Sequence, residues 1–178
     1  VAYWASFAYT AVGSQRRSVE IANAGLEAAI RRRDSLYTSL LAGLLVHTEI
    51  TNLEPERAAR LVALQESFPG LRDPVSLARA MISRSIIEAY RGNWGRVLRV
   101  CERWMAEVRL AGRFQLATAQ LTWAEAKAAT GDLPAGIAAM QEAIPHLETM
   151  QSLAAMHLAR LLALDRQDGA AAELVHQH

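Results

Sequence analysis

At 178 residues, with 52% hydrophobic but only 6% aromatic side chains, the chain has enough apolar material for one ordinary domain or one short repeat array. Its 19 basic residues, of which Lys127 is the one lysine, are balanced by 18 acidic ones, so the net charge of +1 gives no support for direct nucleic-acid binding. The single cysteine, Cys101, excludes an internal disulfide and suits a reducing, cytoplasmic setting, and no apolar run reaches the roughly 20 residues of a membrane-spanning helix.

Ten segments with helical periodicity follow one another, and the alternating Val, Ile and Thr runs that mark strands are missing. The first segment, residues 1–12, is apolar nearly all round and predicts a buried helix. Pro145 removes a backbone donor inside the eighth segment, so we expect a kink or an early stop near Ile144. In chain order the segments cover about residues 1–12, 14–33, 35–50, 54–68, 74–91, 96–110, 114–130, 135–149, 152–164 and 170–175.

Turn signals divide these segments into five pairs at a nearly fixed period. A period of this length indicates helix–turn–helix repeats, which cannot bury their apolar faces alone and must stack on their neighbours. We therefore predict an all-α fold, a right-handed α-solenoid of about five antiparallel repeats forming a single domain over residues 1–178. Because the chain opens inside a helical pattern, we expect it to be a piece of a longer protein. The turns centre on Gly13, Asn52, Gly92, Gly131 and Gln167, which are 39, 40, 39 and 36 residues apart.

The fourth pair has the most regular pattern of small and bulky side chains around its turn. Its turn lies at residues 131–133, and a small residue, Ala124, precedes the turn in the first helix. The second helix then carries small Gly136, bulky Met140 and small Ala143. Small side chains at a helix crossing allow close approach of the two backbones, and a bulky one fills the adjoining gap. This pattern resembles that of a tetratricopeptide repeat (TPR), and the resemblance implies helix packing and no catalytic chemistry.

Elsewhere the match is looser, since Val97, Cys101 and Trp104 occupy the corresponding places in the third pair. The period of about 40 residues also exceeds the 34 of the standard repeat. Longer repeats of this kind are similar to the helical C-terminal regions of large bacterial signalling proteins. In that group an ATPase module is joined to a DNA-binding or nucleotide-cyclase domain, so the resemblance implies a part of a bacterial transcriptional or signalling regulator.

We found no sequence signature of catalysis or cofactor binding. Phosphate-binding glycine loops, dinucleotide fingerprints, nucleophile elbows and zinc-ligand spacings are all missing, so we expect neither an enzyme nor a bound cofactor or metal. His157 is interpreted as a hydrogen-bonded structural residue facing Glu148 or Asp165. A cluster near the chain end is interpreted as a frayed tail rather than a metal site; its members are Glu173, His176 and His178.

The sulfur and indole side chains have mainly structural interpretations. Cys101 lies on a predicted buried stripe, which indicates an inert thiol. Trp104 and Trp123 are interpreted as filler between helices rather than as an aromatic binding surface. Trp94 falls in a predicted turn, and its role stays open.

We favour a non-enzymatic scaffold in which the first helices of the pairs line a concave groove for a peptide or protein partner. Two alternatives remain open: a domain that senses a small-molecule inducer and controls an attached ATPase, cyclase or DNA-binding domain, and a module for self-association, such as a homodimer through the terminal helices. The TPR pattern places Arg79, Ser83, Tyr90, Thr118, Thr122 and Glu125 in the groove, with equivalents near Thr38, Ala42 and Leu45.

Overall fold

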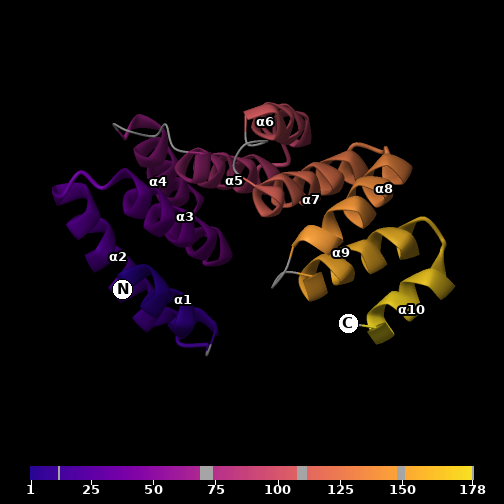
Figure 1. The fold of residues 1–178 in the computed structure, drawn as a ribbon, viewed down its shortest axis with the longest axis horizontal. Coiled ribbons are helices and arrows are strands. Elements are labelled where there is room, and N and C mark those ends of the chain that lie inside the picture. Colours follow the sequence, from indigo (N-terminus) through magenta and orange to yellow (C-terminus); the bar gives the residue numbers. More distant parts are fainter. Residues whose placement is uncertain (12, 69–73, 108–111, 148–150, 178) are drawn as a thin grey trace. The chain divides into compact units, whose positions relative to one another are not determined.

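The computed structural model describes residues 1–11, 13–68, 74–107, 112–147 and 151–177, and within these ranges the chain forms helices and turns without any strand (Figure 1). The all-α prediction is confirmed. Segment ends predicted at residues 12, 110 and 149 lie outside the described residues, as do Glu148 and His178. The elements are α1 (Ala2–Ala11), α2 (Gln15–Arg31), α3 (Ser35–Thr51), α4 (Pro55–Ser67), α5 (Pro74–Tyr90), α6 (Trp94–Glu107), α7 (Arg113–Ala129), α8 (Leu133–Ala143), the 3-10 turn η2 (Ile144–His146), α9 (Gln151–Leu164) and α10 (Asp168–Gln177).

The chain divides into two compact units, Val1–Tyr90 and Arg91–His178, which we call unit 1 and unit 2. Unit 1 contains α1 to α5, and unit 2 contains α6 to α10. That residues 1–178 form a single domain stays a prediction.

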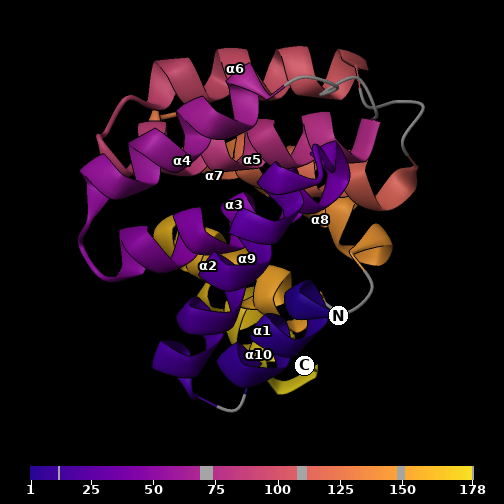
Figure 2. The same cartoon turned by 90° about the vertical axis from the view of Figure 1, so that its left-hand side faces the viewer.

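In unit 1, consecutive helices contact one another, and the first helices of successive pairs, α1, α3 and α5, also contact in turn (Figure 1 and Figure 2). Two clusters of the core are formed by residues that the structure describes. One joins α2 to α3 and contains Ala22, Leu26, Leu41, Ala42 and Leu45, all at most 6% exposed. The other joins α3, α4 and α5 through Val46, Ala58, Val62 and Ile87. Each second helix is therefore covered by the first helix of the next pair, as repeat stacking requires.

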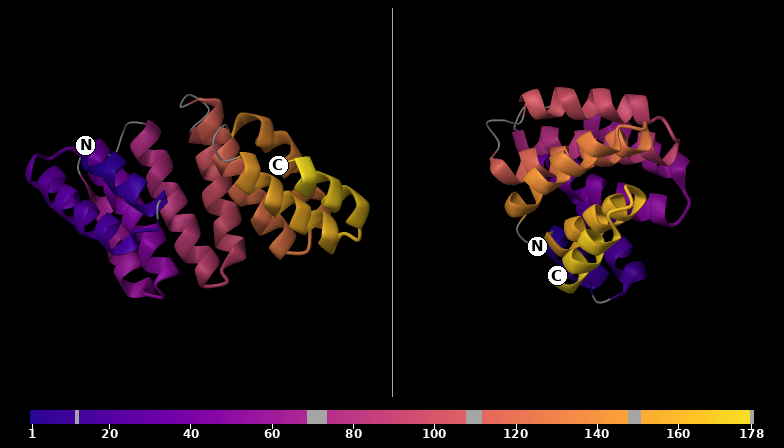
Figure 3. Two further views of the ribbon diagram at one scale, coloured as in Figure 1. Left: turned by 90° about the horizontal axis from the view of Figure 1, so that it is seen from below. Right: turned by 90° about the vertical axis from the view of Figure 1, so that its right-hand side faces the viewer.

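Unit 2 packs by the same rule (the orange and yellow helices of Figure 3). Helix α7 packs against α6 and α8, and α9 packs against α8 and α10. The largest core cluster joins α7, α8, α9 and α10, and the side chains that fill it include Met140, Leu158 and Leu161, each at most 4% exposed. The α8 helix ends at Ala143 and passes into the turn η2, so the early stop expected from Pro145 is confirmed.

The turn inside each pair contains one residue with a positive φ. Positions in all five pairs can be numbered from this residue. Three are glycines, as predicted from the sequence. In the second pair the residue is Leu53 (φ 61°), one position after the predicted centre Asn52. In the fifth pair it is Arg166 (φ 60°), one position before the predicted centre Gln167. Asn52 itself lies in the predicted turn as the C-cap of α3, with a φ of −83°, and is not its left-handed residue. The five residues are Gly13, Leu53, Gly92, Gly131 and Arg166.

Counted from this turn residue, the seventh position before it and the fifth after it are buried in every pair. In the first pair these are Ser6 and Ser18, and the Ser6 hydroxyl lies 2.8 Å from the Ser18 carbonyl oxygen, to which it donates. In the fourth pair they are Ala124 and Gly136, where a Cβ atom added to the glycine would lie 2.7 Å from the Ala124 carbonyl oxygen. In the first and fourth pairs these two positions therefore lie where the helices cross, which confirms the predicted role of Ala124 and Gly136.

Replacing Leu53 by glycine is expected to stabilise unit 1 by about 0.5 kcal/mol. The left-handed conformation costs leucine about 1 kcal/mol, and the greater freedom of glycine in the unfolded chain offsets part of the gain. Packing losses are small because Leu53 is 72% exposed. Thermal denaturation followed by circular dichroism measures the change. The reverse substitution, Gly131→Ala, is expected to destabilise unit 2 by about 1 kcal/mol, since a Cβ there has open space but an unfavourable φ of 95°. Equal melting curves for both variants would contradict this account of the turns.

The structure corrects two expectations and confirms two others. Helix α1 is not buried all round, because Trp4 is 66% exposed; its contacts with α2 and α3 cover one side. Trp94 is the first residue of α6 rather than a turn residue. Cys101 and Trp104 are both 0% exposed, as their predicted structural roles require. Among the described helices, none combines the length and apolar character needed to cross a membrane.

Candidate partner-binding surface

The three residues predicted in the third pair lie on α5 but differ in exposure. Ser83 is 1% exposed, and its hydroxyl donates to the Arg79 carbonyl oxygen at 3.0 Å, so it is part of the helix packing. Tyr90 is 45% exposed, and Arg79 is half-buried. Arg79 and Tyr90 are therefore the members of this set with surface available to a partner.

Arg79 lies across the neighbouring first helices instead of extending into solvent. A Cβ atom added to Gly43 of α3 would fall 2.5 Å from Cδ of Arg79 and 2.8 Å from its Cγ. The arginine stem thus lies directly against the bare backbone of Gly43. Beyond it, the guanidinium reaches α1, where its Nη2 lies 3.4 Å from the Tyr3 hydroxyl. Three consecutive first helices meet at this one side chain.

The surface carried by α1, α3 and α5, which we call the first-helix face of unit 1, has an uneven charge. These helices contain two acidic residues, Glu49 and Glu88, and both are at most 3% exposed. Of their two arginines, Arg84 is paired with Glu66, whose hydrogen bond raises the pKa of the guanidinium. In the part of the chain that the structure describes, no carboxylate pairs with Arg79.

The three residues of the second pair that were predicted to line the groove are core residues. Thr38, Ala42 and Leu45 are at most 1% exposed, and the latter two join α3 to α2. Gly43 and the exposed His47 of α3 point to another side of that helix, because residues three to four positions apart share a face. Thr38, Ala42 and Leu45 therefore have almost no surface available to a partner.

In unit 2, the predicted threonines are engaged with their own helix. The Thr118 hydroxyl donates to the Phe114 carbonyl oxygen at 2.9 Å, and the Thr122 hydroxyl donates to that of Thr118 at 3.1 Å. Thr118 is also 8% exposed. Neither hydroxyl is directed at a partner, so a binding role for these two residues stays a prediction.

Glu125 connects the first helices of the fourth and fifth pairs. Its Oε1 lies 2.8 Å from Nδ1 of His157, and its Oε2 accepts a hydrogen bond from Arg160, both on α9. The hydrogen-bonded role of His157 is confirmed, but its partner is Glu125 rather than Glu148 or Asp165. The apolar side chains of Met156 and Leu164 are 58% and 61% exposed on the same helix.

Replacing Glu125 by glutamine is expected to destabilise unit 2 by about 1 kcal/mol, because one carboxylate holds two α9 side chains in a partly exposed site. Urea denaturation measures the loss. Glu142→Gln on α8 is the matched control, since Glu142 is exposed and has no ion pair in the described residues. Equal losses for the two variants would contradict a role for Glu125 in joining α7 to α9.

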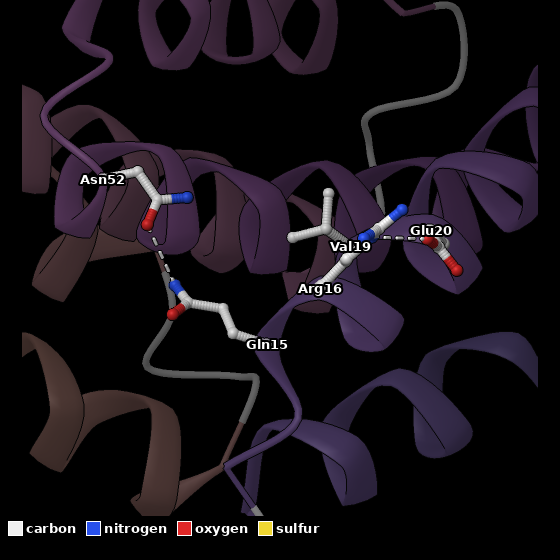
Figure 4. Close-up of a pocket in the computed structure, with 5 residues that line it drawn as sticks. All are labelled: Gln15, Arg16, Val19, Glu20 and Asn52. Carbon is white, nitrogen blue, oxygen red and sulfur yellow. Dashed lines mark hydrogen bonds and ion pairs between the residues drawn. The ribbon is translucent and has the colours of Figure 1, made fainter.

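A surface depression of about 430 Å³ lies in unit 1 between the start of α2 and the end of α3 (Figure 4). Its polar groups are engaged with one another: the Gln15 amide donates to the Asn52 side-chain oxygen at 3.2 Å, and Arg16 pairs with Glu20. All four of these residues are exposed, and Val19 completes the lining. Because the depression is open and its polar side chains pair with one another, few polar groups are available to converge on a small molecule.

Within the described residues, no group of His, Cys, Asp and Glu side chains is arranged to hold a metal ion. Glu173 and His176 lie on α10, whereas the third member of the proposed terminal cluster, His178, lies outside the described residues. The indole nitrogens of Trp104 and Trp123 are buried without a hydrogen-bond partner, which fits packing rather than an exposed aromatic surface.

Comparison with solved structures supports the fold. The chain is similar to the crystal structure of a Podosopora anserina protein described as a kinesin light chain with nearly identical TPR-like repeats. The two share 16% sequence identity at a TM-score of 0.63, over 99% of this chain and 90% of the other. At that identity the likeness establishes a TPR-like helical-repeat fold. The chain matches no protein-family model and no curated protein sequence.

Proposed function

From this TPR-like fold, we propose that the chain is a non-enzymatic scaffold that binds a peptide segment of a protein partner on its first helices. The observation that carries the proposal is the position of Arg79, a cation fixed across three first helices with no carboxylate partner among the described residues. In unit 2, Glu125 and the exposed Met156 and Leu164 of its partner helix α9 offer a comparable mixture of charge and apolar surface. Such a mixture suits a peptide better than an enclosed small molecule.

The test begins with a displayed library of short random peptides selected on the full chain. Selected peptides are then bound in solution, and hydrogen exchange locates them. We expect protection on α3 and α5 or on α7 and α9, and weaker binding after Arg79→Ala or Glu125→Ala. Hydrogen-exchange protection confined to the second helices, or a binding affinity that neither substitution changes, would contradict the proposal. Thermal denaturation of both variants checks that they remain folded.

We further propose that the scaffold serves in a larger bacterial signalling or transcriptional regulator located in the cytoplasm. Two features support this context. The first four turn residues are 40, 39 and 39 positions apart, which is longer than the standard TPR period, and arginine replaces lysine at all basic positions except Lys127. The complete reading frame decides the matter: an adjoining ATPase, cyclase or DNA-binding segment supports it, and an unrelated neighbour contradicts it.

Sensing of a small inducer and self-association are the competing functions. The paired polar groups of the depression near Gln15 weigh against the first. Exposure of Trp4 on α1 and Val175 on α10 is the observation that favours the second. Sedimentation of the full chain at several concentrations separates a monomeric scaffold from a self-associating one.

A further inference from the structure

We infer that the first-helix face of unit 1 selects acidic peptide segments, with Arg79 as the residue that binds their side-chain carboxylates and Gly43 as the residue that positions Arg79. This inference rests on the proposed function, and it names the chemistry of the partner. It follows from three observations: how Arg79 is held, which charges surround it, and which apolar groups lie nearby.

Arg79 is held before any partner arrives. Its stem packs against Gly43, where any larger residue would place a Cβ 2.5 Å from Cδ, and the Tyr3 hydroxyl accepts from one end of the guanidinium. A guanidinium carries five N–H donors in a planar fork that matches a carboxylate. Tyr3 takes one of them in a long hydrogen bond, so donors remain for a ligand. A side chain already ordered loses little conformational entropy on binding.

The charge of the face complements an acidic ligand. Glu49 and Glu88, the two carboxylates on α1, α3 and α5, are buried, so no exposed carboxylate on these helices repels an incoming acid. Arg84 is occupied by Glu66 on α4. The exposed imidazole of His47 lies one helical turn after Gly43 on the same side of α3 and adds a second donor. On these three helices a basic peptide would meet Arg79, His47 and the paired Arg84, and no exposed carboxylate.

Exposed aromatic side chains on α1 and α5 supply apolar surface in addition to this donor. Trp4 follows Tyr3 on α1 and packs edge to face against its ring, with centroids 5.2 Å apart, while remaining 66% exposed. Tyr90 lies at the other end of α5 and is 45% exposed. Exposed aromatics of this kind are common anchors in protein interfaces. The ligand class that fits is an acidic segment with interspersed apolar residues.

The experiment repeats the peptide selection with the full chain and with matched variants. We expect the selected peptides to be rich in Asp and Glu, and their synthetic forms, with both ends blocked, to lose affinity when these residues become Asn and Gln. Arg79→Gln should weaken binding about tenfold or more, as expected for loss of a charged hydrogen bond. Gly43→Ala keeps every charge but displaces the Arg79 stem, so it should weaken binding several-fold while the chain stays folded.

Two control variants make the same kinds of substitution at residues outside the first-helix face of unit 1. Arg60→Gln removes an exposed cation from α4, and Gly95→Ala adds a Cβ on α6 whose nearest neighbour atom in the described part of the chain, Nη1 of Arg99, is 3.9 Å away. Both should leave affinity unchanged.

The outcomes separate the inference from the function it rests on. Peptides that protect the first helices but show no acidic enrichment, or that bind the Arg79→Gln variant as well as wild type, overturn the inference and leave the scaffold proposal standing. If Arg79→Gln weakens binding but Gly43→Ala does not, the positioning role of Gly43 is overturned. Failure to select any peptide that protects first helices overturns both.

Discussion

Replacing Gly136 by valine is expected to destabilise unit 2 by about 3 kcal/mol or more. Gly136 lies at the crossing of α7 and α8, where even a Cβ would approach the Ala124 carbonyl oxygen to 2.7 Å and the Ala128 nitrogen to 3.3 Å. Both are backbone atoms, so the clash cannot be relieved by turning a side chain. The two helices must separate, and separation loosens Met140 and the core that it shares with α9.

Tryptophan fluorescence during urea denaturation measures this effect, because three of the four tryptophans, Trp94, Trp104 and Trp123, belong to unit 2. Gly169→Ala on α10 is the control, since in the described part of the chain no atom beyond its chain neighbours and its own helix backbone lies within 4 Å of the added Cβ. It should be neutral or slightly stabilising. Gly136→Ala should fall between the two. A valine variant that unfolds at the wild-type urea concentration would show that α7 and α8 do not cross closely here.

The second large effect concerns the ion pair between Glu49 and Arg57, and Arg57→Met is expected to destabilise unit 1 by about 2 kcal/mol. Glu49 Oε1 is buried, and Arg57 Nε lies 3.2 Å away without forming a well-directed hydrogen bond. Removing the guanidinium leaves a buried carboxylate uncompensated. Because the Arg57 side chain is 48% exposed, water moderates the loss below the roughly 3–5 kcal/mol of a fully buried pair. Methionine keeps much of the apolar stem, so the charge dominates the change.

A double-mutant cycle isolates this pair. The double variant Glu49→Gln, Arg57→Met should recover most of the lost stability, because no buried charge remains. Arg60→Met, at an exposed site on the same helix, should change stability by less than about 0.5 kcal/mol. Thermal denaturation followed by circular dichroism gives the stability of the wild type, of the single variants Glu49→Gln and Arg57→Met, of the double variant and of the Arg60→Met control. If Arg57→Met matched Arg60→Met, the buried carboxylate would need no partner and this account would be wrong.

The regular parts of the fold were predictable because they depend on local chemistry. Helical periodicity predicted the ten helices, Pro145 predicted the end of α8, and the small residues Ala124 and Gly136 predicted a close helix crossing. Where a turn lacked glycine, the prediction missed by one residue, since nothing in the sequence shows that Leu53 adopts a left-handed conformation. Such a conformation is imposed by the packing of the two helices rather than by the residue itself.

The candidate site was predicted only in part because it depends on contacts between distant segments. Arg79 was chosen from the repeat pattern, but its partner Tyr3 is 76 positions away and is brought near by stacking. Gly43 looks like a weak point in a helix when the sequence is considered alone, and its purpose becomes visible only when the Arg79 stem lies against it. The pairing of Glu125 with His157 likewise spans 32 positions.

The crossing positions also explain why a chain can keep this architecture while its sequence identity to other proteins of the same fold becomes very low. Each pair of helices has compact side chains at two positions, the seventh before and the fifth after the left-handed turn residue. The remaining positions accept many substitutions. Serine, valine, alanine and glycine all serve there: Ser6 with Ser18, Val46 with Ala58, Ala124 with Gly136 and Ala159 with Ala171. Distant homologues are therefore best sought by that twelve-residue interval, repeated along the chain, rather than by overall identity.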